Sequence, residues 1–198
     1  IQTIIRMAAV YGAEIGIGQI DLIGALLLTQ FVGIPFSLIF GRLPRKGDPK
    51  QSFFLGMILY NALTIPLIGI LAPRLGVTSG PVAVGIVLVN QVIAFLLSRY
   101  AFAGLLASLA RRLSTKSAIL LALAVYTLVA IWGYFMRTAV EFWLLAWMVA
   151  IVQGGSQALS RSLYASLSPA AKSGEFFGLF GVMEKFSAIL GPLLFAAA

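Results

Sequence analysis

The chain lacks several residue types on which common catalytic and metal-binding chemistries depend. It contains no cysteine, which excludes disulfide bonds and thiol catalysis, and no histidine, which removes the commonest metal ligand and the usual proton carrier near neutral pH. It also has no Walker A pattern, no nucleophile–base pair and no metal-ligand spacing. We therefore expect no enzyme activity, no catalytic residues, no metal and no cofactor.

Charged residues are also scarce, at 10% of 198 residues, against about 25% in soluble domains. Hydrophobic residues make up 61%, and the mean hydropathy is +1.03. Uncharged or nearly uncharged stretches of about 20 residues recur, and each is long enough to cross a hydrocarbon core of ~30 Å as a helix. They are residues 22–41, 52–73, 75–98, 117–136 and 142–160. The predicted fold class is therefore all-α, a polytopic transmembrane helical bundle.

We predict about seven spans within a single domain, residues 1–198. They cover residues 1–13, 22–43, 52–72, 82–100, 117–136, 142–167 and 176–198. The connections 43–51, 99–116 and 168–174 are basic, whereas the other three are weakly charged or acidic. Basic connections stay in the cytoplasm, so the net charge of +8 indicates membrane orientation rather than nucleic-acid binding. Because Ile1 is not Met and Ala198 ends an apolar run, we expect a piece of a longer protein.

The last two spans carry the candidate functional residues. Small residues lie four apart along the sixth span, in one line on a helix, which lets a neighbouring backbone approach closely. They are Ala146, Ala150, Gly154, Ala158, Ser162 and Ser166. Beside them lie Gln153, Gln157 and Arg161, and an antiparallel hairpin turning near residues 169–172 would bring Glu184 and Lys185 to a similar level. Two interpretations stay open, a buried structural ion pair or a substrate or proton pathway.

Further candidates lie in the first two spans and in the basic connections. Gln2 and Arg6 on the first span and Gln30 in the second are predicted to line the same cavity. The basic residues act either as topology determinants or as a cytoplasmic gate that contacts neighbouring helix ends. The gate candidates are Arg42, Lys46, Lys50, Arg111, Arg112 and Lys116.

Several segments resemble the autophagy-related vacuolar effluxer branch of the major facilitator superfamily. They are "QTIIRMAAVYGAEIG" (2–16), "DLIGALLLTQFVGIPFSLIFGRL" (21–43), "VQGGSQALSRSLYASLSP" (152–169) and "EFFGLFGVMEKFSAILGPLLF" (175–195). The resemblance implies the C-terminal half of such a transporter, with residues 52–100 as an inserted pair of spans. It also implies an amino-acid exporter in fungal vacuoles, and a missing N-terminal half of the same chain.

The function expected is secondary active transport by alternating access, exporting amino acids or similar small polar solutes. The amides would bind polar groups of the solute, Arg6 or Arg161 would neutralise a carboxylate, and Glu184 would receive an ammonium group or a coupling proton. The alternative is a non-transporting membrane scaffold, in which the charged residues only hold helices together. The expected partners are the lipid bilayer and a small-molecule substrate, with no nucleic acid. The expected location is the bacterial cytoplasmic membrane, or the vacuolar membrane in a eukaryote.

Overall fold

The computed structural model describes residues 2–41, 49–106, 115–169 and 172–197, and every regular element in these ranges is helical. The elements are α1 (Gln2–Glu14), α2 (Gln19–Gly41), α3 (Pro49–Arg74), α4 (Gly80–Leu96), the π-helical turn η1 (Leu97–Ala101), α5 (Phe102–Leu105), α7 (Thr115–Phe135), α8 (Ala139–Leu167) and α9 (Ser173–Ala197). The prediction of an all-α fold is confirmed.

Four of the described helices are long and apolar enough to cross a membrane. The segments are Gln19–Ser37, Leu55–Arg74, Gly80–Ala101 and Ser173–Leu194. Shorter apolar segments, Ile119–Phe135 and Ala139–Gly154, lie in α7 and α8. The chain is an integral membrane protein. The count of seven crossings and the insertion of residues 52–100 stay predictions.

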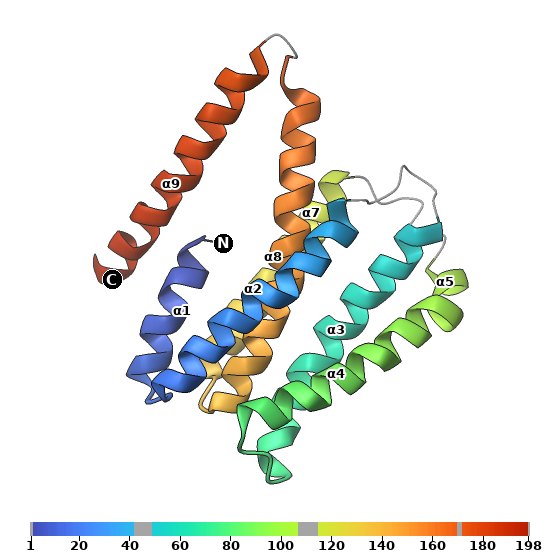
Figure 1. Ribbon diagram of the computed structural model, residues 1–198, viewed down its shortest axis with the longest axis vertical. Coiled ribbons are helices and arrows are strands. Elements are labelled where there is room, and N and C mark those ends of the chain that lie inside the picture. The colour runs from blue at the N-terminus through green and yellow to red at the C-terminus, as the bar shows by residue number, and fades with distance from the viewer. Residues whose placement is uncertain (1, 42–48, 107–114, 170–171, 198) are drawn as a thin grey trace.

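The helices run up and down, and the three weakly charged or acidic connections lie at one end of the bundle (Figure 1). α1 and α3 both end at a glycine with positive φ, Gly16 (φ 85°) and Gly76 (φ 86°). At each, two backbone bonds close the helix, such as Val77 N to Ala72 O at 2.9 Å. α8 begins with a capping box between Thr138 and Glu141. The helix ends that flank the basic connections lie at the opposite end, as the charge pattern predicts.

α8 is the central helix of the bundle. It packs against α2 along much of its length and also contacts α3, α4 and α7. Its first half supplies the core, with Val140, Leu144 and Met148 buried. α9 is different, because it contacts α1 and diverges from α8 after the turn that joins them (Figure 1).

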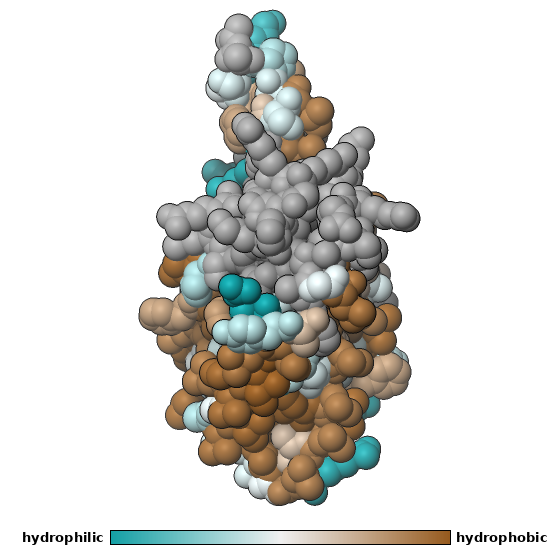
Figure 2. All heavy atoms as spheres, turned by 90° about the vertical axis from the view of Figure 1, so that its right-hand side faces the viewer, coloured by the Kyte–Doolittle hydropathy of each residue, from teal (hydrophilic) through white to brown (hydrophobic). Residues whose placement is uncertain are grey.

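The side of the bundle formed by α4 is apolar and exposed. Figure 2 looks onto this side and shows a broad hydrophobic surface, to which exposed residues such as Val82, Val89 and Phe95 of α4 contribute. The opposite face of α4 is a line of buried residues with small or polar side chains, among them Ala83, Asn90 and Ala94. An apolar outer surface with polar groups turned inward is typical of a helix in contact with lipid.

The polar groups of α4 bond to α3. The Asn61 Nδ2 donates to Gln91 Oε1 at 3.2 Å, and the Gln91 amide donates back to Asn61 Oδ1. The Asn90 Nδ2 donates to Thr64 Oγ1 at 3.2 Å. These bonds satisfy amides in the middle of two apolar helices, so α3 and α4 form a hairpin with its own polar contacts.

Candidate functional site

The small-residue line of α8 packs on a second line in α2. A Cβ atom added to Gly154 would lie 2.6 Å from the backbone oxygen of Gly33 and 2.8 Å from the nitrogen of Ser37, so only glycine fits there. Ala25 and Ala150 are fully buried in the same interface. The close approach predicted from the spacing is therefore present, and it fixes α8 against α2.

The predicted polar strip of α8 lies on an adjacent face. Gln153 and Gln157 are half-buried, whereas the Arg161 side chain is 59% exposed. The strip therefore becomes more accessible from mid-helix toward the turn that leads to α9. The apolar segment of α8 is Ala139–Gly154, so Gln153 lies at its end, and Gln157 and Arg161 lie beyond it. Polar side chains that continue in one line from an apolar segment are the arrangement expected beside a water-filled space.

A buried polar cluster lies at the inner end of the strip. The Gln153 Oε1 and the Tyr126 hydroxyl of α7 are buried and form no regular hydrogen bond within the described ranges. Ser156 faces Tyr126, and its hydroxyl donates to the backbone oxygen of Gln153 at 3.2 Å. A buried polar group without a partner costs about 1–3 kcal/mol, so this cluster is a place where an added polar group would be stabilised.

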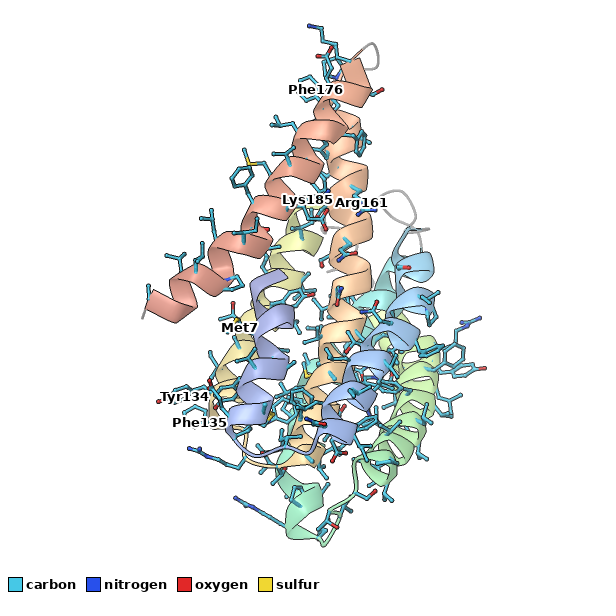
Figure 3. The ribbon with its side chains drawn as sticks, turned by 60° about the vertical axis from the view of Figure 1, so that its left-hand side comes forward. Met7, Tyr134, Phe135, Arg161, Phe176 and Lys185 are labelled. Carbon is cyan, nitrogen blue, oxygen red and sulfur yellow. The ribbon has the colours of Figure 1, made fainter. Side chains whose placement is uncertain are left out.

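Arg161 of α8 and Glu184 of α9 form an ion pair between the two helices. The Arg161 Nη2 lies 3.9 Å from Glu184 Oε2, and the Glu184 side chain is 36% exposed. Lys185 is exposed on α9, and Figure 3 shows it at about the height of Arg161. The pair is long and accessible, so it resembles neither the deeply buried ion pair of the structural interpretation nor two charges turned to lipid.

The two helices are held together at their turn. The Tyr164 hydroxyl donates to the backbone oxygen of Phe176 at 2.8 Å, and its ring packs on Phe177 and Phe180, with ring centroids 5.6 and 5.0 Å away. The predicted antiparallel hairpin is present, but its helices contact each other near the turn and then separate. The aromatic cluster lies at the turn end, and beyond it α8 and α9 diverge (Figure 1).

The other predicted site residues are not brought to this pair by the described geometry. Gln30 is exposed on α2. Gln2 and Arg6 lie on α1, which packs against α9, but their side chains are not described. Of the gate candidates, Arg42, Lys46, Arg111 and Arg112 lie outside the described residues. Lys50 and Lys116 belong to the first turns of α3 and α7, without described side chains.

Sequence reasoning missed Tyr126 and Ser156. Tyr126 lies in the middle of an otherwise apolar span, and a phenol hydroxyl at that depth needs a partner. The position of Tyr126 in the middle of the span is the sequence signal that could have identified it. Ser156 is one turn from Gln153 and Ser160 on α8, but serine hydroxyls commonly bond to their own helix, as Ser160 does to Ser156 O at 2.6 Å.

Comparisons with known proteins found one matching family model and several similar proteins. The family model described as "Vacuole effluxer Atg22 like" matches residues 74–198. The protein named "Uncharacterized MFS-type transporter YxiO", from Bacillus subtilis, is 30% identical over 194 residues, which cover 98% of this chain and 30% of that protein. No solved structure matches the chain.

Two yeast proteins, both named "Autophagy-related protein 22", match shorter stretches. The protein from Pichia angusta is 40% identical over 72 residues, which cover 34% of this chain and 13% of that protein. The protein from Kluyveromyces lactis is 46% identical over 54 residues, or 27% of this chain and 11% of its own length. The chain thus spans less than a third of the length of these curated relatives.

Proposed function

The chain belongs to the Atg22-like vacuole effluxer family, and on that premise we propose that it is part of a secondary active transporter. The transporter exports amino acids or similar small polar solutes by alternating access between two helix bundles. The names of the relatives, a transporter of the MFS type and the autophagy-related protein 22, support this class of function.

One structural observation carries the proposal. Gln153, Gln157 and Arg161 form a single polar strip on α8, and the strip leads to Glu184 on α9 at 3.9 Å from Arg161. Polar and ionisable groups at such positions are expensive in lipid and mark pathways for solutes or protons. The amides bind polar groups of the solute, Arg161 neutralises a carboxylate, and Glu184 receives an ammonium group or a coupling proton.

We further propose that the chain is a C-terminal half of the major facilitator type, in which α3 and α4 are an additional pair of spans. The separate polar contacts between Asn61 and Gln91 and between Asn90 and Thr64 support a hairpin that was added as a unit. The remaining length of the relatives supports a second bundle that supplies the other wall of the cavity. The Bacillus relative favours the cytoplasmic membrane of a bacterium, and the yeast relatives favour a vacuole in a eukaryote.

The test is efflux of radiolabelled neutral amino acids from proteoliposomes that contain the full-length protein. Glu184→Gln keeps the shape of the side chain and removes its charge, and we expect it to slow efflux about tenfold, a change of ~1.4 kcal/mol. Glu175→Gln, at an exposed position in the first turn of the same helix, is the matched control and should transport normally. Normal efflux by Glu184→Gln would remove Glu184 from the mechanism. No efflux by the wild type would remove amino acids as the substrate.

The scaffold alternative has one observation in its favour, because the Arg161–Glu184 contact bridges two helices that otherwise diverge. If the charges serve only to hold helices together, apolar side chains can do the same, so replacing Glu184 and Lys185 together by leucine should retain both the folded protein and its phenotype. If they line a transport pathway, the double variant should fold but lose efflux.

A further inference from the structure

An apolar pocket lies among α1, α2, α7 and α8. Its volume is about 330 Å³. Its wall includes Met7 of α1, Leu26 of α2, Ala130 and Tyr134 of α7, and Leu145 of α8. Figure 3 shows Met7 and Tyr134 on the same side of the bundle. None of the predicted polar site residues lines this pocket.

The wall offers little to a polar ligand. It contains no charged side chain. The hydroxyl of Thr29 donates to the backbone oxygen of Ala25 at 2.9 Å, and the hydroxyl of Tyr11 donates to the backbone oxygen of Tyr134 at 3.3 Å. An apolar cavity of about 150 Å³ stays dry and binds small apolar molecules, so this larger pocket should take a larger apolar group.

The pocket is accessible along α7. In its wall, Ala130 and Tyr134 of α7 are exposed, whereas Ala25 and Met136 are buried. Val10 of α1 and Ile131 of α7, each next in sequence to a residue of the pocket wall, are exposed apolar side chains. Exposed apolar side chains of this kind are suited to contact with lipid hydrocarbon.

A positively charged residue, Arg137, directly follows Met136 of the pocket wall in the sequence. Tyr134 and Phe135 are exposed aromatic residues at the end of α7, as is common where a helix meets the headgroup region. Arg137 follows two residues later, with an exposed side chain that makes no ion pair within the described ranges. The nearby Glu141 carboxylate already accepts hydrogen bonds from Arg137 N and Thr138 in the helix cap.

We propose that this pocket binds one acyl chain of a phospholipid, whose phosphate lies at Arg137. The acyl chain needs only the apolar wall, and the phosphate matches a guanidinium at headgroup depth. An amino-acid-like solute is a poorer fit, because its charged groups would enter a wall without free polar partners. This inference does not depend on transport activity.

Photo-cross-linking in phosphatidylcholine nanodiscs tests the proposal, with a small fraction of phosphatidylcholine that carries a diazirine in one acyl chain. The full-length protein is irradiated and its lipid adducts are located by mass spectrometry. We expect adducts to concentrate on the pocket residues of α1 and α7. Ala130→Phe fills the pocket mouth and should reduce these adducts about tenfold. Ala124→Phe is the matched control, since Ala124 is also exposed on α7 but is not part of the wall.

A second pair of variants tests the headgroup contact. Arg137→Gln should lower the pocket adducts about threefold, whereas Arg74→Gln, at an exposed position at the same end of the bundle, should leave them unchanged. Adducts on the exposed residues of α4, such as Val89, report on folding and on general lipid contact in every variant. Adducts spread equally over α4 and the pocket, and insensitive to Ala130→Phe, would overturn the proposal. So would loss of the pocket adducts when millimolar leucine is added, because the pocket would then belong to a solute.

Discussion

The indole Nε1 of Trp143 donates a hydrogen bond to the Asp21 carboxylate at 2.8 Å, joining the first turns of α8 and α2. The same ring lies against Gly24 of α2, where an added Cβ would be 2.6 Å away, and against Gly80 of α4. One aromatic side chain therefore contacts α2 and α4 from the central helix. This junction is one of the contacts that attach the α3–α4 hairpin to the rest of the bundle, together with the packing of α3 on α8.

Replacing Trp143 by phenylalanine should lower the stability of the protein. The substitution removes the donor and also the far atoms of the indole that lie against Gly24. A hydrogen bond to a charged group is worth about 1.5–3 kcal/mol. Asp21→Asn keeps an acceptor oxygen and should be milder than Asp21→Leu. The measurement is thermal unfolding in detergent. After each heating step, the amount of protein that remains monodisperse is determined on a size-exclusion column. Equal midpoints for wild type and Trp143→Phe would show that the bond contributes nothing.

A second prediction concerns the contact between α8 and α2. Gly154→Ala should destabilise the protein by about 1–3 kcal/mol, because its Cβ would meet the backbone of Gly33 and Ser37 rather than a side chain that can move. Gly85→Ala is the control in α4, where an added Cβ meets nothing within 4 Å, and it should stabilise the helix by up to about 1 kcal/mol. The two alanine variants should therefore shift the unfolding midpoint in opposite directions. A shift of the same sign in both would contradict this account of the packing.

These helix contacts could be predicted only in part from the sequence. The small-residue line through Ala150 and Gly154 predicts that another backbone approaches α8 closely, because spacing on a helix depends only on local geometry. The identity of that neighbour as α2, in place of the adjacent α9, does not follow from spacing. It depends on which surfaces fit, and only the three-dimensional packing reveals it.

The candidate site could also be predicted only in part from the sequence. Gln153, Arg161 and Glu184 are identifiable because polar side chains are rare in these spans, and the structure brings Arg161 and Glu184 together. Tyr126 comes from α7, the helix that precedes α8, and its place beside Ser156 depends on how the two helices pack, so it could not be found from either helix alone. The wide separation of α8 and α9 also escapes the sequence, since hydrophobic pattern fixes the faces of a helix but not its tilt.

The third prediction tests the polar contact within the α3–α4 hairpin. Asn61→Leu and Gln91→Leu should each destabilise the protein, because each leaves its partner amide unpaired in an apolar setting. The double variant should be less destabilised than the sum, with a coupling energy of about 0.6 kcal/mol and at most about 1.7 kcal/mol, the mean and the maximum for hydrogen bonds between membrane helices. Unfolding in mixed micelles gives the four free energies. The control combines Asn61→Leu with Thr127→Val, on the exposed side of α7. The effects of these two substitutions on the free energy of unfolding should be additive. Additive effects at Asn61 and Gln91 would mean that the amides do not interact.

The fourth prediction separates two roles of the Arg161–Glu184 contact by exchanging its charges. If the pair mainly bridges α8 and α9, Arg161→Glu and Glu184→Arg should each slow efflux, and the double exchange should recover most of it, because opposite charges again face each other across 3.9 Å. If the two groups bind opposite ends of a solute, the exchange also reverses the field around that solute, and efflux should stay low. We expect the second result, because both side chains are too exposed for the contact itself to be worth more than about 1 kcal/mol. Initial efflux rates of the four proteins, with their folding checked by thermal unfolding, decide between the roles. Full recovery by the double exchange would assign the pair to helix bridging and move the search for solute contacts to Gln153 and Gln157.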